Sequence, residues 1–302
     1  RAQRAGAFAS QDACFDGASF SMPTYRGGRH EHGQNFLTDH TTIDRLSRLV
    51  GDSTGPIVEI GPGQGRLTRE LQKLGRSLTA VEIDSRLADR LASASQFREQ
   101  KHVTVVNADF LHWPLPTTPY VVVGNVPFHL TTAILRRLLH DGAWTQVVLL
   151  VQWEVARRRA GIGGSSMMTA QWWPWIDFSL HGRVPRSAFK PAPSVDGGLL
   201  EMTRRPDPLL SPDARESYRQ FVHDVFTSRG RGIGEILANV STSLGKRGAL
   251  QLLKSEGIRS SSLPKDLSAE QWARLFTSAS PTKSAKTGRN AHPAHSARRQ
   301  GR

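Results

Sequence analysis

Four consecutive residues, Asn125-Val126-Pro127-Phe128, combine two hydrogen-bond acceptors with an aromatic face. The side-chain oxygen of Asn125 is one acceptor, and the carbonyl of Val126 or Pro127, placed by the fixed φ of proline, is the other. Acceptors on both N–H bonds of an exocyclic amino group would localise the lone pair on its nitrogen, and Phe128 offers a face for base stacking. Taken alone, the run could also be a turn with a core phenylalanine. Its residue types predict methyl transfer to a base amino group, in which in-line positioning supplies most of the rate.

A glycine-rich run, Gly61-Pro62-Gly63-Gln64-Gly65, is typical of a loop whose backbone approaches a ligand closely. Its G-x-G-x-G spacing differs from the G-x-G-x-x-G of dinucleotide binders, and the sequence has no P-loop lysine pattern. Glu82 lies 21 residues after Gly61, where a carboxylate can accept both hydroxyls of a ribose. The loop alone could be a tight turn. Together with Glu82 it predicts a ligand that has a ribose but no pyrophosphate, and S-adenosylmethionine fits that description.

A third run, Asn107-Ala108-Asp109-Phe110, follows the next apolar stretch. Asp109 could accept a hydrogen bond from an adenine amino group, and Phe110 or Ile83 could pack on the adenine ring. These residues extend the predicted adenosyl site to three neighbouring strand ends.

The elements that must position these residues alternate along the chain. Short apolar runs, typical of buried strands, are followed by stretches of helical spacing, and the runs lie at residues 57–60, 78–81, 103–106, 120–123 and 147–151. Continuous valine-rich runs are typical of a parallel sheet that helices cover on both faces. The predicted fold class is therefore α/β, a Rossmann-like S-adenosylmethionine-dependent methyltransferase domain with ligands at the carboxyl ends of the strands.

After about residue 206 the pattern becomes helical, which predicts a smaller C-terminal helical domain. Its basic residues, Arg229, Arg231, Lys246 and Arg247, favour RNA binding. The predicted organisation is a flexible N-terminal arm (1–28), the methyltransferase domain (29–205), the helical RNA-binding domain (206–276) and a disordered basic tail (277–302).

The composition favours a polyanionic partner. The net charge is +14 and the isoelectric point is about 10.9, and the predicted tail holds six basic residues and no acidic one. A solubilising tail without a partner is the alternative. The single cysteine, Cys14, excludes an internal disulfide and a cysteine-based zinc site. Without a long apolar run or a secretory pattern in residues 1–19, the sequence predicts a cytoplasmic protein that binds neither membrane nor metal.

Six blocks of the chain occur in the order found in the rRNA adenine N6-methyltransferases. They are Gln34-Asn35-Phe36-Leu37, residues 59–65, Val81-Glu82-Ile83-Asp84, Asp109, Gly124-Asn125-Val126-Pro127-Phe128 and residues 189–196. Over residues 28–276 the chain resembles the erythromycin-resistance (Erm) branch of that family.

The resemblance implies a role for each matching residue. Gln34, Asn35 and Leu37 would line the cofactor cleft, and Gly61 and Gly63 would pass under the methionine part of S-adenosylmethionine. Glu82 would bind the ribose, Asp109 the adenine, and Asn125 both cofactor and target amine. Phe128 and Phe189 would clamp the flipped adenine from opposite sides.

The resemblance also implies a substrate, one adenine in the macrolide-binding region of 23S rRNA. Methylation there confers resistance to macrolide, lincosamide and streptogramin B drugs, and we expect a monomer that acts before ribosome assembly is complete. Two alternatives stay open. One is a 16S rRNA adenine dimethyltransferase, and the other is a nucleic-acid-binding protein that kept the fold and lost the chemistry.

Overall fold

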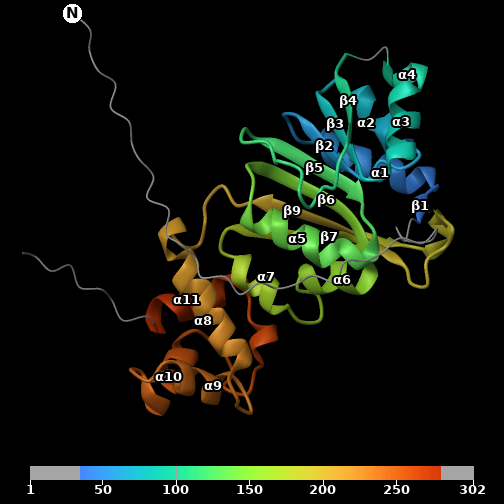
Figure 1. Ribbon diagram of the computed structural model, residues 1–302. Helices are drawn as coiled ribbons and strands as arrows, with labels where there is room; N and C mark the ends of the chain where they lie inside the picture. The colour runs from blue at the N-terminus through green and yellow to red at the C-terminus, as the bar shows by residue number, and fades with distance from the viewer. Residues whose placement is uncertain (1–34, 99–100, 280–302) are drawn as a thin grey trace, which may run out of the picture. The chain divides into compact units, whose positions relative to one another are not determined.

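The computed structural model describes residues 35–98 and 101–279. In this part of the chain, seven strands form one sheet in the order β4-β3-β2-β5-β6-β9-β7, which Figure 1 shows from β4 to β7. The short strands β1 and β8 pair separately. The bounds are β1 Phe36–Leu37, β2 Ile57–Ile60, β3 Leu78–Glu82, β4 Val103–Asn107, β5 Tyr120–Asn125, β6 Trp144–Gln152, β7 Ile176–Val184, β8 Phe189–Lys190 and β9 Gly197–Arg204.

The central strands are buried on both faces because their side chains alternate between two apolar clusters. On β5, Val121 and Val123 face one cluster, whereas Val122 faces the other. Ile43 and Leu46 of α1 cover the first face, and α5 covers the second. The predicted α/β fold is confirmed, and the valine-rich runs are its parallel strands β2 to β6.

Strand β9 makes the sheet mixed rather than parallel throughout. It pairs antiparallel with both β6 and β7. No α-helix lies between β7 and β9, so the chain lacks the crossover that a parallel return requires.

The α-helices of the described residues divide into two sets. The first set accompanies the sheet: α1 His40–Gly51, α2 Arg66–Leu71, α3 Ser85–Ser93, α4 Ser95–Arg98, α5 Thr131–His140, α6 Trp153–Arg159 and α7 Met167–Trp172. The second set follows β9: α8 Arg215–Thr227, α9 Ile233–Val240, α10 Gly245–Ser255 and α11 Ala269–Ala279. Short 3₁₀ turns lie at Gln72–Leu74, Phe128–Leu130, Arg186–Ala188, Pro212–Ala214 and Pro264–Asp266.

The second set packs against α7 through Tyr218 of α8 (Figure 1). The Tyr218 hydroxyl donates a 2.8 Å hydrogen bond to the Ala170 carbonyl of α7. The rings of Trp175 and Phe276 meet the Tyr218 ring edge to face, with centroids 5.4 and 5.3 Å away. The helical region and the sheet region therefore share one continuous core.

Helix α11 continues to Ala279, beyond the predicted start of the tail at residue 277. Ala279 is buried, and the Ser241 hydroxyl donates to its carbonyl at 3.2 Å. These contacts hold the last helical turn, so the boundary predicted at residue 276 was too early. The predicted arm, Gln34 and the rest of the predicted tail lie outside the described residues.

Candidate active site

The candidate site lies at the carboxyl ends of β2 and β5, where the strand order reverses. From β2 the chain builds outward to β3 and β4, and from β5 it builds the other way to β6. Ile60 is directly opposite Gly124, so Gly61 and Asn125 leave the sheet side by side. A Cβ on Gly124 would lie 2.7 Å from the Ile60 carbonyl, so this close approach requires glycine. Such a switch point is where open α/β sheets bind ligands.

The glycine loop and Glu82 are hydrogen-bonded to each other. One Glu82 carboxylate oxygen accepts the Gly63 N–H at 2.9 Å, and the other accepts the Asp84 N–H at 3.0 Å. Gly63 has φ of 54°, and a Cβ there would lie 2.9 Å from the Phe36 ring. Glu82 is 2% exposed, and each of its two carboxylate oxygens accepts one backbone N–H. Glu82 thus fixes the loop that the sequence predicts to pass under the cofactor.

Asn125 is oriented by the segment before α1. Its side-chain nitrogen donates a 2.8 Å hydrogen bond to the Asn35 carbonyl, and this identifies the other end of the amide as the oxygen. The Asn35 segment is itself held by β1, in which Leu37 pairs with Phe189 of β8. The structure therefore brings Asn35 into contact with Asn125, and Leu37 lines the same cavity as Asn125, although residues 35 and 125 are far apart in the sequence.

The two carbonyls that could serve as the second acceptor are not equivalent. The Pro127 carbonyl accepts the Leu130 N–H at 2.9 Å and so closes the 3₁₀ turn Phe128–Leu130. Val126 donates its own N–H to the Leu150 carbonyl of β6 at 3.3 Å, which fixes the peptide unit at the strand end. The geometry favours the Val126 carbonyl as the second acceptor.

The predicted clamp of Phe128 and Phe189 differs from the arrangement found. The two ring centroids are 6.3 Å apart and the ring planes meet at 75°, an edge-to-face contact. Phe189 is 2% exposed because it packs in the core cluster that contains Leu37, and its ring lies 3.3 Å from the Cβ position of Gly197. A base cannot lie between two rings that already touch. Phe128, which is half-buried, is the ring that can take a stacked base, and Phe189 supports its edge.

The adenine contacts predicted at the ends of β3 and β4 are only partly available. Ile83 is 48% exposed, whereas Phe110 is 5% exposed and lies in the core beneath the Arg137 guanidinium, 5.3 Å from the ring centroid. Of the two side chains, Ile83 is the one exposed enough to meet an adenine ring, whereas Phe110 packs in the core. Asp109 is partly exposed but already accepts the Leu111 N–H at 2.9 Å and contacts the His112 ring at 2.8 Å.

Glu59 has no role predicted from the sequence, but its side chain lines a cavity at this site. The cavity lies between the β1 segment, the glycine loop and Asn125, and its lining residues are Phe36, Leu37, Glu59, Gly61, Pro62, Gln64, Arg66, Leu67 and Asn125. Glu59 is 1% exposed, and its Oε2 atom has no hydrogen-bond partner among the described residues. Burial raises the pKa of Glu59 to about 8, and the nearby Glu82 charge acts in the same direction against the Thr68 hydroxyl. In the sequence, the signal for this residue was a single carboxyl side chain within the apolar run 57–60.

Two features are absent from residues 35–98 and 101–279. No group of three or more histidine, cysteine, aspartate or glutamate side chains is placed to hold a metal ion. No helix there has both the length and the apolar character that crossing a membrane requires.

Comparison with known proteins gives consistent matches. The sequence profile of the family described as ribosomal RNA adenine dimethylase matches residues 26–280. The chain is 59% identical over 216 residues to an rRNA adenine N-6-methyltransferase of Corynebacterium diphtheriae, covering 72% of this chain and 84% of that one. It is 44% identical over 260 residues to the mycinamicin-resistance protein MyrB of Micromonospora griseorubida, covering 86% and 81%. The crystal structure of the 23S rRNA methyltransferase ErmE superposes with a TM-score of 0.74 at 34% identity, covering 81% of this chain and 99% of ErmE.

Proposed function

The chain belongs to the ribosomal RNA adenine dimethylase family, and from that premise we propose that it methylates the N6 amino group of one adenine in 23S rRNA. The names of ErmE and MyrB support 23S rRNA as the substrate and drug resistance as the outcome. By the same reasoning the methylated ribosome would resist macrolide, lincosamide and streptogramin B drugs.

The residues around the glycine loop fit S-adenosylmethionine. Its ammonium group would pair with Glu59, a buried carboxyl whose Oε2 has no partner in the described part of the chain. Glu82 would hold the ribose hydroxyls while it keeps the Gly63 N–H, and Ile83 would cover the adenine. Asp109 would accept a hydrogen bond from the adenine amino group. When bound, S-adenosylmethionine supplies an electrophilic methyl group.

Three groups of the chain would prepare the target amine. The Asn125 side-chain oxygen and the Val126 carbonyl each accept one N–H, which concentrates the lone pair on the nitrogen. Phe128 stacks on the flipped adenine and aligns that lone pair with the methyl group. No side chain has to remove a proton before transfer, because the amine loses its proton to water afterwards.

One observation carries this proposal: the Asn35 carbonyl binds the Asn125 amide nitrogen beside Gly61, at the strand reversal. A turn with a purely structural role would not require an oriented amide beside a glycine loop of the kind that binds ligands. The protein is further proposed to be cytoplasmic and monomeric, and to meet its rRNA before ribosome assembly is complete.

A methyl-transfer assay on protein-free 23S and 16S rRNA tests the proposal. The purified protein is incubated with radiolabelled S-adenosylmethionine and each RNA, and the modified nucleotide is located by mass spectrometry. We expect label on one adenine of 23S rRNA. Label on 16S rRNA alone would reassign the enzyme to the small subunit, and binding without any label would favour a nucleic-acid-binding protein.

A further inference from the structure

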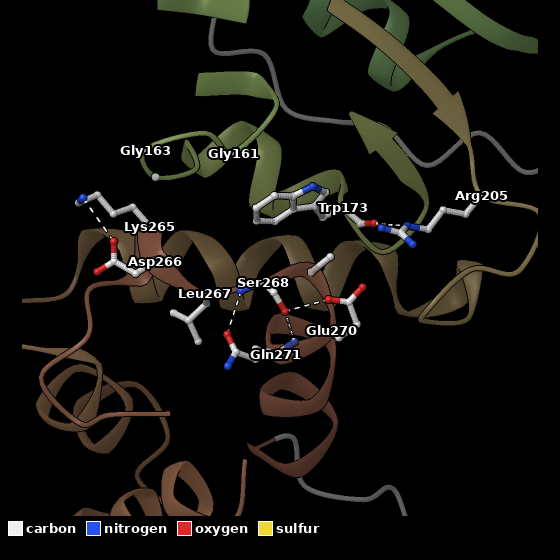
Figure 2. A pocket seen from close by; sticks show the side chains of 12 residues that line it. Gly161, Gly163, Trp173, Arg205, Lys265, Asp266, Leu267, Ser268, Glu270 and Gln271 are labelled. Carbon is white, nitrogen blue, oxygen red and sulfur yellow. Dashed lines mark hydrogen bonds and ion pairs between the residues drawn. The ribbon is translucent and has the colours of Figure 1, made fainter. Parts of the chain in front are cut away.

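A second cavity lies outside the methyl-transfer site, where the α6–α7 loop faces the start of α11 (Figure 2). Its volume is about 700 Å³, within the range of sites that hold a nucleotide. It is lined by Gly161, Gly163, Gly164, Trp173, Arg205, Lys265, Asp266, Leu267, Ser268, Ala269, Glu270 and Gln271. The Ser165 N–H donates to the Lys265 carbonyl at 2.8 Å and ties the two sides together. None of the residues assigned above to cofactor or target adenine lines this cavity.

One wall is aromatic and pre-formed. In Figure 2 the Trp173 indole lies between Gly161 of the α6–α7 loop and Ser268. A Cβ on Gly161 would lie 2.8 Å from the Trp173 ring, so only glycine lets the loop run this close to the indole. Arg205 donates from Nε to the Trp173 carbonyl at 2.9 Å and pairs with Asp177 at 2.5 Å, which fixes the far end of the wall. A tryptophan held in this way offers a rigid stacking surface.

The opposite side is polar and holds both signs of charge. The Lys265 ammonium contacts the Asp266 carboxylate at 3.3 Å, and both side chains are nearly half exposed. Such an exposed pair contributes little, so the ammonium can turn to a phosphate. The Ser268 hydroxyl donates to the Glu270 carboxylate at 2.8 Å and accepts the Gln271 N–H at 3.2 Å, so the Glu270 carboxylate is the acceptor for an amino group of a base. An aromatic face, a half-exposed ammonium and a carboxylate acceptor in one cavity match the base face, the phosphate and the base amino groups of a nucleotide.

The position along the chain points to RNA. Helix α6 begins where β6 ends, and Leu150 of β6 is paired with Asn125. The seven residues of α6 span about 10 Å. Only this short helix separates the α6–α7 loop from the end of β6 beside the catalytic turn. An RNA strand whose target adenine is stacked on Phe128 can therefore extend to the cavity with a few nucleotides. We propose that the cavity binds one unpaired nucleotide of the substrate RNA, with its base on Trp173 and its phosphate on Lys265, and this rests on the proposed function.

Matched variants of the full chain test this site. Trp173→Leu removes the π face, Trp173→Phe keeps one, Lys265→Gln removes the cation, and Lys254→Gln is an equal charge change on the exposed side of α10. Binding of a 23S rRNA fragment containing the target adenine is measured at several salt concentrations. S-adenosylmethionine affinity and the single-turnover rate at saturating RNA serve as controls for an intact fold and active site.

We expect Trp173→Leu to weaken RNA binding about 10- to 100-fold and Trp173→Phe by less than about threefold. Lys265→Gln should weaken binding a few-fold and reduce the log–log salt slope by about 0.7, whereas Lys254→Gln should match the wild type. Both controls should stay at wild-type values. Photocrosslinking of the RNA fragment should label the peptide that contains Trp173.

Wild-type RNA affinity in both Trp173→Leu and Lys265→Gln would overturn the nucleotide site. If adenosine or guanosine monophosphate binds the wild type but RNA affinity is indifferent to Trp173→Leu, the cavity takes a free nucleotide and the RNA assignment is wrong. A wild-type protein that binds and methylates neither rRNA would instead refute the proposed function.

Discussion

The roles of Glu82 and of its neighbour Asp84 can be separated by substitution. Its carboxylate holds the Gly63 N–H and is proposed to bind the ribose hydroxyls, whereas the neighbouring Asp84 caps α3 by accepting the Arg86 and Leu87 N–H groups. Glu82→Ala should weaken S-adenosylmethionine binding by about 1.5–3 kcal/mol for each hydrogen bond lost. RNA affinity should barely change. Calorimetric titration of the cofactor checks this.

Asp84→Ala is the matched control for that variant. It should lower the free energy of unfolding by about 0.5–2 kcal/mol through loss of the cap, with cofactor affinity retained. If Glu82→Ala binds S-adenosylmethionine as tightly as the wild type, the ribose assignment is wrong.

Glu59 makes stability depend on pH. An unfolded glutamate ionises near its ordinary pKa of 4.5, whereas burial keeps the folded carboxyl protonated up to a pKa of about 8. Between these values the folded state binds more protons than the unfolded state, so the free energy of unfolding falls as pH rises and levels off above pH 8. Glu59→Gln keeps the size and removes the titration. It should change stability by less than about 1 kcal/mol at pH 5 and raise it by about 4 kcal/mol at pH 8.

Urea unfolding of both proteins without cofactor, at pH 5 and pH 8, measures this difference. A constant difference between variant and wild type across that range would contradict a protonated Glu59.

For single residues, the sequence indicated candidates through their hydrogen-bonding groups. It did not reveal the contacts that depend on side-chain packing. Asn125 and Glu82 could be proposed from the sequence because an amide or a carboxylate at a strand end has few structural uses. The burial of Phe110 and the contact between Phe189 and Phe128 depend on side-chain packing from distant parts of the chain, which residue type does not reveal.

Among the elements, the packing of α8 against α7 depends on one buried hydroxyl, that of Tyr218. Ala170 lies in the last turn of α7, where carbonyls lack helical partners, and the Tyr218 hydroxyl supplies the missing donor. Burial raises the pKa of Tyr218, so the hydroxyl stays protonated and able to donate. Tyr218→Phe should therefore lower the free energy of unfolding by about 1–3 kcal/mol.

Tyr120→Phe is the internal control, measured by the same denaturant unfolding. The Tyr120 hydroxyl is equally buried but has no hydrogen-bond partner in residues 35–98 and 101–279, so its removal should be neutral or stabilising. Equal losses in the two variants would mean that the Tyr218 hydrogen bond does not dock α8.

The strands were more predictable than their order. Valine-rich runs identify β2 to β6 because both faces are covered, and the helical spacing around Tyr218 and Trp272 identifies α8 and α11. The antiparallel position of β9 was not predictable, since it depends on the connection from β7 rather than on the composition of either strand.

For the whole molecule, the net charge of +14 makes RNA affinity sensitive to salt. Residues 280–302 hold six basic residues, and α11 ends before them. Deleting 280–302 should keep the fold and the cofactor affinity but weaken RNA binding. The log–log salt slope should become shallower by about 0.7–0.9 for each lost phosphate contact.

A full-length variant with these six residues replaced by glutamine separates charge from chain length. Wild-type slopes for both proteins would mean that the segment only adds solubility. Deletion from residue 277 would confuse the result, because it removes the end of α11 that Ser241 holds.

The most direct test of the account is the single-turnover rate of methyl transfer to 23S rRNA at saturating S-adenosylmethionine, compared for the wild type, Phe128→Leu and Asn125→Ala. Phe128→Leu keeps an apolar surface but loses the stacking face, so its rate should fall about 10- to 100-fold. Asn125→Ala should fall further, because the amine loses one of its two acceptors, and RNA binding should persist. If Asn125→Ala transfers methyl groups at the wild-type rate, Asn125 does not act on the amine and the proposed mechanism is wrong.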